Sequence, residues 1–245
     1  MEDLMMSSEE AYELAMNYYH GTNGYEKDLE AAFYWFACVL DGDFRIDALA
    51  QTGHMLALGE GREQDLEQAA FDLFVAADQG HELAKKEFES VKNFIDFDSA
   101  KVQRRLGVQY SSIGEQKKAI DWLTKAAEQG DVDSLIWLGG IYSLIDPEKR
   151  LEYYHKAYEK GSEEAACLIG CAYEQGEGVE VDYGKAFEYY TFAANKGYPP
   201  AMASLASMYE EGRGTEKDAK KAEHWSHLFK VIESQLPYSD YYEYE

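Results

Sequence analysis

The chain has 245 residues, of which 46% are hydrophobic and twenty are tyrosine, so it can bury a sizeable core and does not resemble a disordered chain. Its formal net charge at pH 7 is −24. A surface of this sign repels phosphate groups and anionic lipid, which argues against nucleic acid and membrane as partners. The same charge attracts a basic protein surface, although acidic residues also serve solubility alone.

The acidic excess is strongest at the N-terminal end, where residues 1–80 hold only three basic residues, Lys27, Arg45 and Arg62. Three cysteines (Cys38, Cys167 and Cys171) give no disulfide framework, which suits a reducing compartment. The first ten residues lack the basic and apolar regions of a secretory signal. The longest apolar run, Ala31–Leu40, is shorter than the roughly 20 residues that span a membrane. We therefore expect a soluble, cytoplasmic protein.

One pattern recurs along the chain. The first half of the unit begins with a small residue. Leu or Ile follows four positions later, Gly or Ala comes next, and Tyr lies three positions further on. The second half consists of a G-x-G, an acidic residue and an Ala that is expected to be buried. In chain order, the Ala position is held by Ala32, Ala69, Ala119, Arg150, Ala186 and Ala222. The acidic residue four positions earlier is Asp28, Asp65, Glu115, Asp146, Asp182 and Asp218. Six matches in six positions indicate a repeat protein.

The spacing within each unit predicts two helices joined by a turn. Ala165, Ile169, Gly170 and Tyr173 share one stripe of a first helix. The G-x-G ends that helix because Gly adopts positive φ at little cost, and the acidic residue caps the second helix. A single hairpin of this kind cannot cover its own apolar stripe, so the pattern predicts a stacked array of such hairpins.

The segment from Ile169 to Gly197 resembles the Sel-one-like repeat, a relative of the tetratricopeptide repeat. The resemblance covers roughly residues 8–230; it is most specific in the last two repeats and degenerate in the first and fourth. It implies an all-α fold, an α-solenoid with a right-handed superhelix of about six helix-turn-helix repeats. It also implies an adaptor or scaffold function.

The repeat is interrupted between residues 82 and 92. The spacing from Ala69 to Ala119 is longer than the others, and Asp98–Ser99 is a candidate N-cap for a new helix. We expect an extra helix near 82–92 that divides the chain into an acidic part (1–92) and repeats 3–6 (98–230); a degenerate ordinary repeat is the alternative. The Tyr-rich acidic tail, 231–245, is expected to cap the array, dock onto a partner or fray.

Candidate chemistry is sparse. Cys167 and Cys171 (i, i+4) and His224 and His227 (i, i+3) each offer two metal ligands, but no second pair completes either set. The G-x-G pairs lack the Lys-Ser/Thr of a phosphate-binding loop. We expect no cofactor, no resident metal and no catalytic activity.

Helical geometry predicts the partner-binding surface. In each first helix, the face opposite the buried stripe carries the positions that line the concave groove of solenoids resembling tetratricopeptide repeats. The residues predicted there, or at its edge, are Glu9, Tyr12, Met16, Tyr19, Asp47, His54, Arg104, Glu174 and Glu210. The aromatic members are suited to anchor a partner, whereas the alternative is that Tyr12 or Tyr19 packs against a neighbouring repeat.

Three functions remain open at this point. The leading one is a non-catalytic adaptor that binds a protein or peptide with a basic surface through its concave and acidic N-terminal surface. The second is a bacterial immunity protein that neutralises a toxin, for example a nuclease, by charge complementarity. The third and least favoured is a metal-dependent enzyme.

Overall fold

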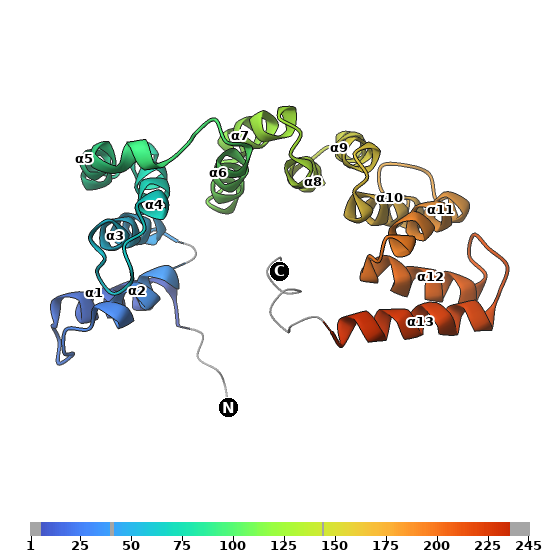
Figure 1. Cartoon of the computed structure of the whole chain (residues 1–245), viewed down its shortest axis with the longest axis horizontal. Coiled ribbons are helices and arrows are strands. Elements are labelled where there is room, and N and C mark those ends of the chain that lie inside the picture. Colours follow the sequence, from blue (N-terminus) through green and yellow to red (C-terminus); the bar gives the residue numbers. More distant parts are fainter. Residues whose placement is uncertain (1–5, 40–41, 144, 236–245) are drawn as a thin grey trace. The chain divides into compact units, whose positions relative to one another are not determined.

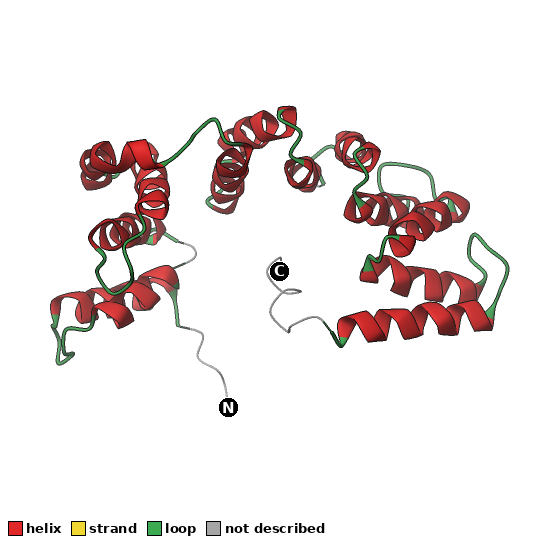
Figure 2. Cartoon of the chain, in the orientation of Figure 1, coloured by secondary structure: helices red, strands yellow, loops and turns green. Residues whose placement is uncertain are grey.

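The computed structural model describes residues 6–39, 42–143 and 145–235. Within these ranges the chain is built from helices alone, without a strand (Figures 1 and 2). The helices are α1 (Ser8–His20), α2 (Leu29–Ala37), α3 (Arg45–Leu58), α4 (Leu66–Asp78), α5 (Glu82–Val91), a short 3₁₀ helix η1 (Lys92–Phe94), α6 (Ala100–Ser112), α7 (Gln116–Glu128), α8 (Val132–Tyr142), α9 (Pro147–Glu159), α10 (Glu163–Gln175), α11 (Tyr183–Asn195), α12 (Pro199–Glu211) and α13 (Ala219–Glu233).

The helices form two compact units, residues 1–113 and 114–245. Inside each unit, helices adjacent in sequence pack as hairpins: α1 with α2 and α3 with α4 in the first, α8 with α9, α10 with α11 and α12 with α13 in the second. The all-α solenoid of helix pairs predicted from the sequence is confirmed, and α5 with η1 is the extra helix. No helix in the described part of the chain is both long and apolar enough to cross a bilayer.

The repeated acidic residue caps the second helix, as predicted. Each of five aspartates accepts a hydrogen bond from a backbone N–H in the first turn of the helix that it precedes: Asp28, Asp65, Asp146, Asp182 and Asp218. Glu115, the one glutamate in the series, makes no such bond. Ser99 does occupy the N-cap position of α6, but its side chain accepts no capping hydrogen bond.

The second glycine of each G-x-G lies where no side chain fits. A Cβ atom on Gly61 would stand 2.1 Å from the carbonyl oxygen of Leu29, and one on Gly214 would stand 1.9 Å from that of Tyr183. Leu29 and Tyr183 are the first residues of α2 and α11. Gly178 meets the start of α9 in the same way. The turn of each of these repeats therefore rests directly on the backbone of the preceding repeat, at the start of its second helix.

Glycines inside the first helices bring the two helices of a pair together. A Cβ on Gly170 would stand 2.8 Å from the ring of Tyr190, and one on Gly139 would stand 2.2 Å from the ring of Tyr154. The repeated alanines of the second helices are buried, as predicted. Arg150, which replaces one of them, is also buried; its guanidinium reaches the next turn and donates to the Glu177 carboxylate at 2.7 Å.

The extra helix alters the stacking inside the first unit. His81 lies 3.4 Å from Asp47, and His54 lies 3.0 Å from Glu87, so α5 runs parallel to α3 as the next first helix would. In the first halves of the two helices Arg105 of α6 contacts Gln68 of α4, and near their ends the Tyr110 hydroxyl donates to Asp78. These two contacts show that α6 runs parallel to α4. Within this unit, α6 thus occupies the place of a second helix, although its sequence matches a first helix.

The expected division between residues 92 and 98 stays a prediction. The boundary between the two compact units falls between residues 113 and 114. At the C-terminal end, α13 continues to Glu233, so the first residues of the expected tail are helical. The four tyrosines of that tail (Tyr238, Tyr241, Tyr242 and Tyr244) lie outside the described residues.

We predict that Gly214→Ala destabilises the chain more than Gly197→Ala. Both glycines have positive φ (66° and 94°), so both substitutions carry a left-handed strain of about 1–2 kcal/mol. A Cβ atom added at Gly214 would have backbone atoms within 3 Å, whereas one added at Gly197 would have no heavy atom within 4 Å. The clash adds about 1–3 kcal/mol, measurable by chemical denaturation. Equal losses for the two variants would show that the close approach of the two repeats is unimportant.

Candidate functional site

The first helices of the first unit form a face on which aromatic and acidic side chains meet. We call this the acidic face and define it by Glu9, Tyr12, Met16 and Tyr19 of α1, Asp47 and His54 of α3, Glu60, and Glu87 of α5. The four α1 residues follow one another at helical spacing and so share one side of the helix. The structure therefore brings together six of the nine residues predicted to bind a partner.

Tyr12 is anchored in the core at its ring and reaches the acidic face at its hydroxyl end. The ring stacks on Phe44 at 5.0 Å and meets Phe36 edge-on at 5.6 Å. Burial, and secondarily the charge of Asp47, raises the pKa of the Tyr12 hydroxyl. Phe44 directly precedes α3, the first helix of the next repeat. The ring of Tyr12 therefore packs against a neighbouring repeat, as the alternative interpretation proposed.

Tyr19 is hydrogen-bonded to one carboxylate of the acidic face, and the charge of a second acts on its hydroxyl. Its hydroxyl donates to Glu60 Oε2 at 3.0 Å. Burial is the main cause that raises the pKa of Tyr19, followed by this hydrogen bond and by the charges of Glu60 and Glu87. Lys27 lies over the ring, 5.7 Å from its centre. Glu60 is therefore the direct acidic partner of Tyr19, which sequence analysis had placed on this face without that partner.

The two histidines of the region each meet a carboxylate of the acidic face. His54 Nδ1 lies 3.0 Å from Glu87 Oε2, and His81 Nε2 lies 3.4 Å from Asp47 Oδ1. Both pairs join α3 to α5. Asp47 retains 47% and Glu87 36% of its side-chain exposure, so both carboxylates remain open to a partner.

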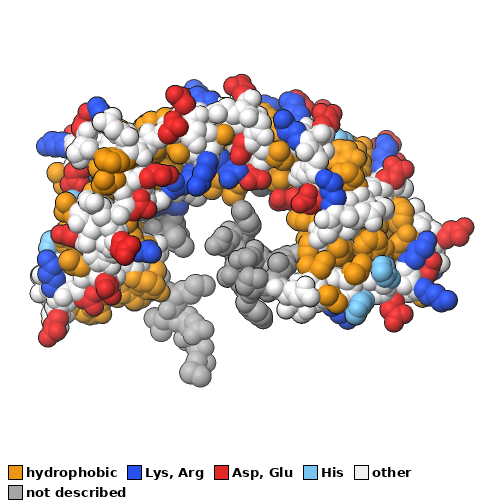
Figure 3. All heavy atoms as spheres, viewed as in Figure 1, with side chains coloured by type: hydrophobic (Ala, Val, Ile, Leu, Met, Phe, Trp, Pro, Cys, Tyr) orange, Lys and Arg blue, Asp and Glu red, His pale blue; other side chains and the backbone are white. Residues whose placement is uncertain are grey.

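The other α1 residues behave differently from one another. Glu9 is exposed in the first turn of α1, whereas Met16 packs against the buried core of the first two repeats. Figure 3 shows Asp and Glu side chains spread over the visible side of the first unit, with hydrophobic side chains between them.

Arg104 lies half-buried on α6, the helix that runs alongside α4. Arg104 therefore lies outside the acidic face as defined here, and its role in binding a partner stays a prediction.

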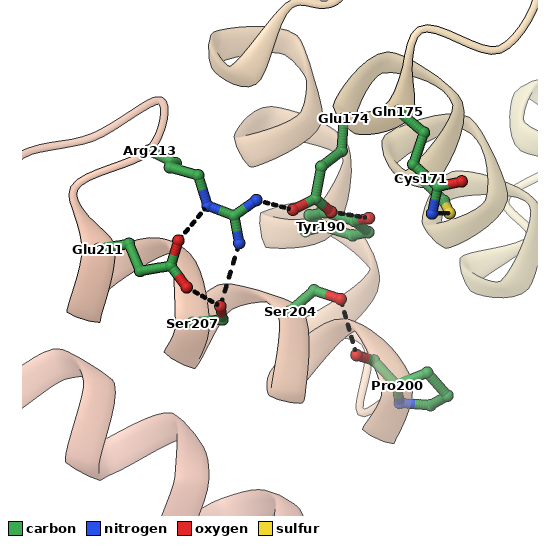
Figure 4. Close-up of polar contacts among 9 residues, drawn as sticks. All are labelled: Cys171, Glu174, Gln175, Tyr190, Pro200, Ser204, Ser207, Glu211 and Arg213. Atoms are coloured by element: carbon green, nitrogen blue, oxygen red, sulfur yellow. Dashed lines mark hydrogen bonds and ion pairs between the residues drawn. The ribbon is translucent and has the colours of Figure 1, made fainter.

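In the second unit, Glu174 belongs to a polar network (Figure 4). One carboxylate oxygen pairs with Arg213 at 2.6 Å, and the other accepts the Tyr190 hydroxyl at 2.8 Å. Arg213 also donates to Ser207 at 3.1 Å. Glu174 thus ties α10 to α11 and to the turn after α12, so a partner would have to compete with internal bonds. Glu210, on α12, is exposed.

The cysteine and histidine pairs do not assemble into a larger ligand set. Among the residues that the structure describes, no group of three or more His, Cys, Asp or Glu side chains is arranged to hold a metal ion. Burial raises the pKa of the Cys167 thiol to about 12, and it also raises that of Cys171. These thiols are therefore poor sources of the thiolate that a nucleophile or metal ligand requires.

A second feature of the first unit is a groove of about 1110 Å³. It is lined by parts of α2, α3 and α4, by the turn before α4, and by Phe94 and Gln109. Asp72 lies on its wall, with only 6% of its surface exposed. Thr52 donates to one of its carboxylate oxygens at 3.1 Å and Gln68 to the other at 2.7 Å. Sequence analysis missed Asp72, although an acidic residue inside the apolar run 69–77 was a signal.

Burial raises the pKa of Asp72 to about 6, although hydrogen bonds from Gln68 and Thr52 and the charge of Arg105 lower it in part. Because this folded-state pKa exceeds the unfolded one, the folded chain binds the proton more tightly, and stability falls as pH rises from about 4 to above 6. We predict that Asp72→Asn removes this loss, so that the variant gains up to about 3 kcal/mol relative to wild type across the interval. Urea denaturation of both proteins at several pH values measures the gain; a difference that does not vary with pH would contradict the prediction.

We also predict that Glu174→Ala destabilises the second unit by about 1–3 kcal/mol, because the substitution leaves the Tyr190 hydroxyl without its acceptor and removes one of the acceptors of Arg213. Glu210→Ala, an exposed acidic residue on a neighbouring helix, should change stability by less than about 0.5 kcal/mol. Thermal and chemical denaturation distinguish the two. If both variants matched wild type, Glu174 would be free to serve a partner.

Comparison with known proteins agrees with this architecture. A segment of 74 residues is 36% identical to the ERAD-associated E3 ubiquitin-protein ligase component HRD3 of Candida glabrata, covering 30% of this chain and 9% of that protein. The chain thus matches less than a tenth of that relative's length. A Sel1 repeat protein of Oxalobacter formigenes superposes with a TM-score of 0.52 at 25% identity, over 94% of this chain and 87% of the other.

An immunity protein of Pseudomonas aeruginosa superposes with a TM-score of 0.43 at 20% identity, over 90% of this chain and 82% of the other, a similarity too low to carry an argument about function. The Sel1 repeat pattern itself matches six segments, residues 11–38, 46–81, 100–131, 138–162, 163–198 and 199–228. These segments cover more than half of the sequence, and the chain therefore belongs to the Sel1 repeat family.

Proposed function

We propose that this Sel1-repeat scaffold holds a protein partner with a basic surface on the acidic face of its first unit. The observation that carries the proposal is the hydrogen bond of Tyr19 to Glu60, on a face where the charge of Asp47 acts on Tyr12 and that of Glu87 on Tyr19. Carboxylates in this arrangement attract and orient a cationic surface, and tyrosines are frequent energetic anchors at interfaces.

The aromatic part of the acidic face is rigid before any partner arrives. Tyr12 is fixed by Phe36 and Phe44, and Tyr19 by its hydrogen bond to Glu60. Side chains that are already ordered lose little conformational entropy on binding, which favours affinity. The acidic residues around them act mainly on the association rate and on the choice of partner, and their effect weakens with salt.

The nature of the partner separates the two protein-binding functions that the sequence left open. An adaptor would hold a basic protein or peptide of the cell. An immunity protein would hold a toxin, such as a nuclease with a basic substrate channel. Both make the same chemical demand on the acidic face, so the identity of the retained protein decides between them.

We predict that replacing Glu9, Glu60 and Glu87 together by Gln reduces partner retention at least about tenfold, because the variant removes three negative charges from the acidic face. The measurement is affinity capture from the native lysate at low and high salt, with quantitative mass spectrometry. The matched control replaces Glu180, Glu188 and Glu210 by Gln; all three are exposed in the second unit, and the change in net charge is equal.

A basic protein that is retained by wild type and by the control, lost with the acidic-face variant and weakened by salt would support the proposal. Equal loss with both variants would show a response to net charge alone. Retention that neither variant nor salt alters would place the binding surface elsewhere on the chain.

A further inference from the structure

Helix α5 lies outside the six Sel1 segments, and it packs mainly against α4 and less extensively against α3. Its buried residues are Ala84 and Val91 alone. Phe88 adds ring contacts to Phe74 at 5.5 Å and to Phe97 at 6.3 Å. In the first turn, however, Ala84 is the one buried residue, and Glu82, Leu83 and Lys85 are exposed, so this turn depends more on its N-cap than the rest of the helix does.

The first turn of α5 is capped by a histidine. His81 occupies the N-cap position, and its Nδ1 accepts the backbone N–H of Ala84 at 3.1 Å. A ring nitrogen that accepts a hydrogen bond carries no proton, so the neutral ring must hold its proton on Nε2. That nitrogen is the one that lies 3.4 Å from Asp47. Neutral His81 therefore caps α5 with Nδ1 and contacts α3 with Nε2.

Protonation makes these two contacts incompatible. Imidazolium bears a proton on each nitrogen, so Nδ1 no longer accepts from Ala84, and a cation at a helix N-terminus is opposed by the helix dipole. The charged groups that face His81 are Asp47 on α3, which also acts on Tyr12, and Glu82 on α5, which pairs with Lys85. Protonated His81 thus keeps Asp47 and gives up the cap.

We propose that His81 is a pH-dependent switch in the acidic face: the neutral ring caps α5, and the protonated ring releases the first turn of α5 while it remains paired with Asp47. Histidine changes charge between about pH 5 and pH 8, so mild acidification drives the change. The released turn contains Ala84, one of the two buried residues of the helix, and the exposed Leu83. The significance for a partner rests on the proposed function, because α5 contributes Glu87 to the acidic face.

The test is amide hydrogen exchange of the full chain at about pH 7.5 and about pH 5.5, corrected for intrinsic exchange rates. We expect protection of the Ala84 and Lys85 amides to fall about fivefold at the lower pH, the effect of losing a helix N-cap. The first turn of α10 is the internal control, because its cap is the Ser162 hydroxyl, which accepts from Ala165 at 3.1 Å and does not titrate in this range.

Two variants assign the effect. His81→Asn keeps a good N-cap that does not titrate, so it should abolish the fall in protection, whereas His54→Gln should leave it unchanged. A fall that persists in His81→Asn, or no fall in wild type, would overturn the proposal. Nitrogen NMR shifts of His81 at high pH provide a second measurement: a proton on Nδ1 in place of Nε2 would also overturn it. Since no partner takes part, failure here would leave the proposed function untouched.

Discussion

The close approach of three turns, at Gly61, Gly178 and Gly214, to the preceding repeat is the constraint on which this fold depends. The second glycine of the turn lies against the first peptide of the preceding second helix, where Gly214 leaves less than 2 Å for a Cβ atom beside the Tyr183 carbonyl. The next aspartate then starts the second helix by capping it. Because the same turn both joins two repeats and starts a helix, a substitution there alters packing and secondary structure together.

Helix α5 shows how this regular arrangement accommodates an insertion. It continues the row of first helices by lying parallel to α3, and two histidine–carboxylate pairs join the two helices. It also places Glu87 near Tyr19. The part of the first unit that departs most from the family pattern therefore contributes directly to the surface that we propose as functional.

The sequence predicted the fold well because the repeat encodes local geometry. Positive-φ glycines, N-cap aspartates and alanines at helical spacing each report a backbone requirement that recurs with every repeat. The site was predicted less completely. The face of α1 was identified by periodicity, but the contacts of Tyr12 with Phe44 and of Tyr19 with Glu60 join positions more than thirty residues apart. The place of α6 beside α4 depends on contacts of Arg105 with Gln68 and of Tyr110 with Asp78. Tyr110 holds the repeated Tyr position and is buried, but the repeat pattern names neither its Asp78 partner nor the contact of Arg105.

The central claim is that the acidic face of the first unit is the partner-binding surface. Amide hydrogen exchange of the chain with and without the protein that it retains tests this claim most directly, because it locates the contact without altering a residue. The account predicts new protection in α1, α3 and α5, together with the turn that holds Glu60. Protection confined to the second unit, or to the groove beside Asp72, would contradict it.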